Sequence, residues 1–127
     1  MTAPKPVILL VEDNEVNRDM LVRRLQRAGH QVATAADGET ALTAMREQQP
    51  AVVLMDMNLP VKDGWTACRE AQQDASIAEI PIIALTAHAM QEDKHRALEA
   101  GCSDYATKPV DFPDLLKKIA AQLDARY

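Results

Sequence analysis

The chain has 127 residues, of which 47% are hydrophobic and 26% are charged, and its formal net charge at pH 7 is -5. This length and composition suit one soluble globular domain with its own core. The acidic balance argues against direct nucleic-acid binding and against adhesion to anionic membranes. No apolar run reaches the length of a membrane span and the N-terminus lacks the form of a signal peptide, so we expect a cytoplasmic protein without membrane insertion.

Five short apolar segments predict strands, and segments of helical period alternate with them. In chain order the predicted strands cover residues 6–12, 31–36, 51–56, 80–86 and 103–108. The apolar positions that mark the five helices are Val16, Met20, Leu21, Leu25 and Ala28, then Ala41, Leu42 and Met45, then Trp65, Cys68 and Ala71, then Met90, Ala97 and Leu98, and finally Phe112, Leu115, Leu116, Ile119, Ala120 and Leu123. The first, third and fourth strands are almost continuously apolar, which is typical of central parallel strands, whereas the other two suit sheet edges.

Residues between these segments fit the same alternation. Gly29 and Gly101 fall where helices should end, and Asp37 with Gly38 predicts a turn. Asp111, with Asp114 three positions later, predicts a helix N-cap. A β-α alternation repeated five times predicts a parallel sheet with helices on both faces.

Polar residues gather at the predicted strand ends, where ligands bind in open parallel sheets. The first strand ends in Glu12 and Asp13, the third in Asp56, the fourth in Thr86 and the fifth in Lys108. With the strand order 2-1-3-4-5, the four strands that carry them are neighbours. We therefore expect these side chains to form one site.

Three converging carboxylates need a cation, and hard oxygen ligands without His or Cys favour Mg²⁺. Lys108 suits a phosphate or a pairing with Asp56, and the Thr86 hydroxyl can donate to an oxygen. Such a site can support a carboxylate nucleophile that forms an aspartyl phosphate. No glycine-rich phosphate loop and no GxSxG elbow occur in the sequence. The two cysteines, Cys68 and Cys102, lie 34 residues apart without clustered histidines, which predicts reduced thiols and not a zinc site.

The segments "ILLVEDN", "VVLMDMNLPVKDG", "PIIALTA" and "AGCSDYATKP" resemble the receiver domain of two-component response regulators, the CheY-like family. The resemblance spans essentially the whole chain. It implies a flavodoxin-like (βα)5 fold, an α/β architecture with a five-stranded parallel sheet in the order 2-1-3-4-5. It also implies a single receiver domain over residues 1–127, which we expect to be a standalone regulator or the receiver of a hybrid kinase, with no output domain.

The resemblance also implies roles for individual residues. Asp56 matches the phosphoacceptor, Thr86 the switch hydroxyl, Lys108 the phosphate-binding lysine and Tyr105 the aromatic switch. Glu12, Asp13, Asp56 and the backbone carbonyl of Asn58 match the Mg²⁺ ligands. The bond between Lys108 and Pro109 matches a cis peptide bond of the family. Asn58 and His88 lie where the family tunes the rate of hydrolysis.

The implied function is a phosphorelay receiver. A histidine kinase or a histidine phosphotransfer protein donates a phosphoryl group to Asp56 with Mg²⁺, and the receiver catalyses its own phosphorylation and slow dephosphorylation. The face made by the fourth helix, fifth strand and fifth helix then binds a downstream protein, with the receiver a monomer or weak dimer.

Two alternatives stay open at this point. One is a receiver-shaped interaction module that is never phosphorylated, although Asp56, the acidic pair and Lys108 are all present. The other is an aspartyl-nucleophile phosphatase of the haloacid dehalogenase type, which normally has a second Asp where this chain has Asn58. The loop residues Val61 and Lys62 also depart from what the receiver family often shows.

Overall fold

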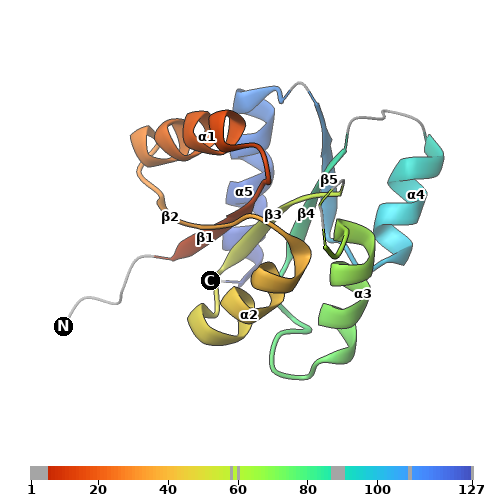
Figure 1. The fold of residues 1–127 in the computed structure, drawn as a ribbon. Helices are drawn as coiled ribbons and strands as arrows, with labels where there is room; N and C mark the ends of the chain where they lie inside the picture. The colour runs from red at the N-terminus through yellow and green to blue at the C-terminus, as the bar shows by residue number, and fades with distance from the viewer. Residues whose placement is uncertain (1–5, 58, 60, 87–90, 109, 127) are drawn as a thin grey trace.

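The computed structural model describes residues 6–57, 59, 61–86, 91–108 and 110–126. It shows five strands that alternate with five helices (Figure 1). The strands are β1 (Val7–Val11), β2 (Gln31–Ala35), β3 (Val52–Asp56), β4 (Ile82–Thr86) and β5 (Asp104–Thr107). The helices are α1 (Glu15–Arg27), α2 (Gly38–Gln48), α3 (Gly64–Gln73), α4 (Gln91–Glu99) and α5 (Phe112–Arg126). Each strand lies inside the segment that the sequence predicts for it.

The five strands form one parallel sheet in the order β2-β1-β3-β4-β5, so the predicted order and the two predicted edge strands are confirmed. The strands lie in register near their ends: Val11 pairs with Met55, Asp56 with Leu85, and Thr86 with Thr107. The C-terminal ends of all five strands therefore meet along one side of the sheet, which we call the carboxyl edge. Loops that leave this edge are the ones that can build a site.

Helices cover both faces of the sheet, as predicted (Figure 1). On one face, alternate residues of β1 and β3 pack with buried residues of α2, α3 and α4. On the other face, the intervening residues of the same strands pack with α1 and α5. The strand segments Ile8–Val11, Val52–Asp56 and Ile82–Thr86 are buried on both faces, which explains why they read as continuous apolar runs.

Helix α1 packs through a narrower face than its apolar pattern predicts. Leu21 and Leu25 are buried one turn apart, whereas Val16 is 77% exposed and Met20 is 49% exposed. The apolar positions Val16 and Met20 mark the helix as predicted, but the side of α1 that carries them faces solvent. Leu98 of α4 is also 46% exposed, and Met90 lies outside the described residues.

The predicted helix boundaries hold, with one correction. Gly29 and Gly101 have φ values of 95° and 101°, in the left-handed region that ends helices. The Asp111 carboxylate accepts a hydrogen bond from the backbone N–H of Asp114 at 3.2 Å, so the predicted N-cap is confirmed. Asp37 and Gly38 do not form a separate turn. Asp37 is the N-cap of α2 and Gly38 is its first residue.

No helix in the described ranges combines the length and the apolar character that a membrane span requires.

Candidate functional site

Three carboxylates meet at the carboxyl edge of the sheet. Glu12 follows β1 and is 2% exposed, and its backbone N–H donates to the carbonyl of Ala35 at 3.0 Å. Asp13 is exposed. Asp56 is the last residue of β3 and is 4% exposed. One oxygen from each of the three acidic side chains lies within 4.8 Å of the others, so the predicted convergence is confirmed.

Lys108 forms ion pairs with two of these carboxylates. Its backbone N–H donates to the carbonyl of Thr86 at 2.8 Å, which extends the pairing of β5 with β4 by one step. Its Nζ donates to Oδ2 of Asp56 at 2.9 Å and to Oε2 of Glu12 at 3.2 Å. The lysine side chain is 29% exposed, whereas the two carboxylates are almost fully buried. The expected pairing of Lys108 with Asp56 is therefore present.

Burial and the neighbouring charges shift the pKa of two members of the cluster, Glu12 and Lys108. Burial raises the pKa of Glu12, and the neighbouring Asp56 carboxylate raises it further against the opposing effect of Lys108. Burial alone lowers the pKa of Lys108, but its hydrogen bonds and attraction to Asp56 and Glu12 outweigh burial and leave the pKa above its usual value. Lys108 is therefore a fixed positive charge at neutral pH.

The donor set fits a hard divalent cation. Three carboxylates and one ammonium group leave the cluster with two uncompensated negative charges when all four groups are ionised. All the donors are oxygens, and no imidazole or thiolate belongs to the described cluster, which favours Mg²⁺ over softer metals. This geometry agrees with the prediction that the acidic residues Glu12, Asp13 and Asp56 can bind a metal ion.

Thr86 lies on β4, the strand beside β3, and Tyr105 lies on β5, the next strand along the sheet. Thr86 ends β4 and is 4% exposed. Tyr105 lies in β5, is partly exposed and packs against the core under α2, α3 and α4. Lys118 of α5 donates to the Tyr105 carbonyl at 2.6 Å, and its Nζ lies 5.0 Å from the centre of the Tyr105 ring. The sequence analysis missed Lys118, because only the packing of α5 brings it to β5.

Three residues with predicted roles, Asn58, His88 and Pro109, lie outside the described residues.

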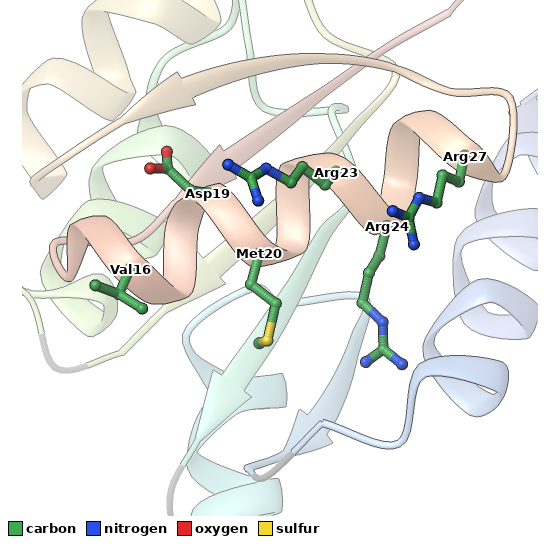
Figure 2. A pocket seen from close by; sticks show the side chains of 6 residues that line it. All are labelled: Val16, Asp19, Met20, Arg23, Arg24 and Arg27. Carbon is green, nitrogen blue, oxygen red and sulfur yellow. The ribbon is translucent and has the colours of Figure 1, made fainter.

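A groove opens directly beside the acidic cluster. It has a volume of about 550 Å³, and Glu12 and Lys108 line it together with residues of α1 that include Met20 and Arg24. A second groove of about 560 Å³ follows the outer side of α1 (Figure 2). It is lined by Val16, Asp19, Met20, Arg23, Arg24 and Arg27. The sequence analysis missed this surface, because the helical spacing of Val16 and Met20 does not show which side of α1 faces the sheet.

The family model for the response regulator receiver domain matches residues 8–120, which is most of the chain. The chain belongs to the response regulator receiver domain family. This receiver is thus a signalling domain of two-component systems, and the match favours neither of the two alternatives left open by the sequence.

Among curated relatives, the transcriptional regulatory protein AfsQ1 of Streptomyces coelicolor is 42% identical over 118 residues, which cover 93% of this receiver and 51% of AfsQ1. The receiver spans about half or less of the length of the curated relatives that it matches.

Two solved structures show the same fold with higher coverage. The receiver domain of sensor histidine kinase PA1611 from Pseudomonas aeruginosa, which has a magnesium ion in its active-site cleft, is 38% identical with a TM-score of 0.87, over 95% of this chain and 99% of that one. The receiver domain of Ssk1 from Saccharomyces cerevisiae, solved with the histidine phosphotransfer protein Ypd1, is 35% identical with a TM-score of 0.83, over 94% of this chain and 89% of the solved one.

Proposed function

We propose that this receiver accepts a phosphoryl group on Asp56 from a phosphohistidine. The observation that carries the proposal is the position of Asp56, which ends a buried strand with Lys108 at 2.9 Å and the Glu12 and Asp13 carboxylates beside it. A carboxylate oxygen of Asp56 attacks phosphorus, the P–N bond to the donor imidazole breaks, and the imidazole nitrogen leaves with the bonding electron pair. Lys108 neutralises charge on the transferring group, and the Thr86 hydroxyl donates to a phosphoryl oxygen.

Glu12, Asp13 and Asp56 are the side chains that would hold Mg²⁺, and the backbone carbonyl of Asn58 is the further ligand that the family resemblance implies. When bound, the cation supplies a positive charge that offsets the carboxylates and the incoming phosphoryl oxygens. The solved receiver of PA1611 holds magnesium in its cleft, which supports the same cation here. The receiver's own residues then catalyse both acceptance of the phosphoryl group and its slow hydrolysis.

The phosphorylated state shifts the receiver between two conformations. The new phosphoryl oxygens draw Thr86 towards Asp56, and the space that the threonine leaves is filled by the Tyr105 ring. Tyr105 and Lys118 connect β5 to α5, so the face formed by α4, β5 and α5 changes and a downstream protein binds it with altered affinity.

The phosphohistidine donor docks on α1, beside the groove that reaches Glu12 and Lys108. Figure 2 shows Val16, Met20 and Arg24 along one side of this helix, at the four-residue spacing that aligns side chains. Val16 and Met20 are exposed and apolar, which favours an apolar contact with the donor around its histidine. The solved complex of Ypd1 with the Ssk1 receiver supports a phosphotransfer protein as donor.

Transfer from a purified, radiolabelled histidine phosphotransfer protein tests the proposal. The receiver should gain label in Mg²⁺ and not in EDTA, and Asp56→Asn should gain none. Label that persists on Asp56→Asn would contradict the assignment of the acceptor.

Met20→Asp separates docking from chemistry. It should slow transfer from the protein donor, because a charge enters an apolar contact, yet leave phosphorylation by phosphoramidate unchanged, because a small donor needs no docking surface. Asp19→Asn, a neighbouring change on the same helix that leaves Val16 and Met20 in place, is the control. Equal slowing with both donors would contradict docking on α1.

A further inference from the structure

The chain leaves the acceptor strand through residues 57–63, which we call the acceptor loop; its described residues are 57, 59 and 61–63. A backbone hydrogen bond joins the first residue of the loop to Gly64, the residue that follows it. At its start, the Met57 carbonyl accepts a hydrogen bond from the Gly64 N–H at 3.1 Å. A Cβ at position 64 would lie 2.6 Å from the Asp56 carbonyl oxygen, so only glycine permits this close approach. The conformation of the loop therefore bears directly on the backbone of Asp56.

Lys62 ties the middle of this loop to two helices. Its Nζ lies 2.9 Å from Oε2 of Glu39 in α2 and also forms an ion pair with Glu70 in α3. The Lys62 side chain is only 21% exposed, although both of its partners are more open to solvent. The hydrogen bonds to Glu70 and Glu39 raise the pKa of Lys62, so it stays charged. One ammonium group thus joins α2, α3 and the acceptor loop.

The backbone of Lys62 makes a further connection to α2. Its carbonyl accepts a hydrogen bond from the N–H of Gly38 at 3.0 Å. A Cβ on residue 38 would lie 2.1 Å from that carbonyl oxygen, which explains glycine at the first position of α2. Both the main chain and the side chain of Lys62 therefore hold the loop against the start of α2.

The residue before Lys62 shows that the loop is held under strain. Val61 has a φ of 64°, a conformation that β-branched residues rarely adopt. The residue is 85% exposed, so no burial of Val61 compensates for the strain. Such a conformation persists only where surrounding contacts over-determine it. The described contacts nearest to Val61 are those of Lys62 with Gly38, Glu39 and Glu70.

We propose that Lys62 is a positioning residue, whose ion pairs to Glu39 and Glu70 hold the acceptor loop so that the chain leaves Asp56 in a direction that favours cation binding. The inference rests on the proposed function, because it concerns the same cation site. Lys62 touches neither the acidic cluster nor Lys108 in the described contacts, so its effect passes through the loop.

Lys62 also neutralises two acidic side chains that would otherwise repel each other. Without its ammonium group, Glu39 and Glu70 would face each other across the loop as unpaired carboxylates. A loss of function in a variant at position 62 could therefore come from this repulsion alone. The test must separate lost positioning from lost charge balance.

The experiment is calorimetric titration of the receiver with MgCl₂, together with urea unfolding in EDTA. Lys62→Met should weaken Mg²⁺ binding by about tenfold, which is the low end of the cost of losing a residue that hydrogen-bonds a metal ligand. Lys62→Arg can keep both ion pairs and should stay within about twofold of the parent. The triple variant Lys62→Met with Glu39→Gln and Glu70→Gln should recover stability but not Mg²⁺ affinity.

Arg46→Met is the matched control, because Arg46 of α2 forms a 2.8 Å ion pair with Asp74, beyond the end of α3 and away from the acceptor loop. It should leave Mg²⁺ affinity unchanged. Two results would overturn the proposal: Lys62→Met that binds Mg²⁺ like the parent, or a triple variant that regains full affinity. With either result, the proposed function still stands if the parent binds Mg²⁺ and accepts phosphoryl groups. A parent that binds no Mg²⁺ would contradict the proposed function itself.

Discussion

Lys108→Met tests whether the site is held together by its one lysine. The substitution keeps most of the aliphatic volume but removes the ammonium group that donates to Asp56 at 2.9 Å and to Glu12 at 3.2 Å. Hydrogen bonds to charged groups contribute about 1.5–3 kcal/mol each, and removing one partner of a buried pair costs about 3–5 kcal/mol. Because the lysine side chain is 29% exposed, water reaches part of the uncompensated charge. We therefore expect a loss of about 3 kcal/mol, the lower end of that range.

Urea unfolding in EDTA at pH 7, followed by circular dichroism, measures this loss. With a urea m-value of about 1.5 kcal/mol per M, the midpoint should fall by roughly 2 M. Lys108→Arg keeps a positive charge and should lose much less. Mg²⁺ should narrow the difference between Lys108→Met and the parent, because the cation takes over part of the neutralisation of Asp56 and Glu12. A Lys108→Met midpoint equal to that of the parent in EDTA would refute the reasoning, as would equal losses for the two variants.

Three further predictions concern other parts of the molecule. Val61→Asn should raise the free energy of unfolding by about 1 kcal/mol, because Asn tolerates the left-handed backbone that Val61 adopts and no buried surface is lost. The hydrogen bond from Arg46, together with hydrogen bonds from Ser76, lowers the pKa of Asp74 to about 2. The contribution of Asp74 to stability is therefore complete above its ordinary pKa of 3.8 and is lost as the pH falls towards 2. Arg46→Met should reduce that pH dependence in acid unfolding curves, because it removes the largest of these effects. The Sγ atoms of Cys68 and Cys102 lie 3.3 Å apart in the core, and this contact and burial raise the pKa of Cys68, so neither thiol should react with iodoacetamide until the receiver unfolds.

Each of these three predictions has an outcome that would contradict it. Val61→Ala keeps the left-handed strain of a residue with a Cβ, and an equal gain from it would point away from strain relief. Acid unfolding that is unchanged in Arg46→Met would show that another group sets the low-pH limb. Alkylation of the native receiver at the same rate as in urea would show that the two thiols are accessible.

The central and edge positions of the strands and the carboxyl-edge cluster were predictable from sequence because each depends on local pattern and one topological rule. The full strand order was implied by the family resemblance and is confirmed by the sheet. The runs that end at Val11, Asp56 and Thr86 are apolar on both faces, so they could only be central strands. Once the sheet is parallel, its strand ends must meet, and Glu12 and Lys108 come together although 96 residues separate them in the chain.

The parts that were wrong or missed depend on packing that no local pattern encodes. Val16 and Met20 have the four-residue spacing of one helix face, but α1 is oriented so that Leu21 and Leu25 pack in the core instead. The amphipathic pattern alone cannot set that rotation.

The ion pairs of Lys62 illustrate the second kind of gap. Their partners lie on two helices, and only the packed positions of α2 and α3 place Glu39 and Glu70 around one ammonium group. The sequence analysis identified Val61 and Lys62 as departures from the family but could not predict their contacts. Likewise, the contact of Lys118 with Tyr105 requires the position of α5 against β5.

The central claim is that Asp56 is the residue that receives the phosphoryl group, and intact-mass spectrometry after incubation with phosphoramidate and Mg²⁺ tests it most directly. We predict that the receiver gains the mass of one phosphoryl group, that EDTA prevents the gain, and that Asp56→Asn shows none. A receiver that gains no mass under these conditions, or an Asp56→Asn variant that gains as much as the parent, would contradict the claim.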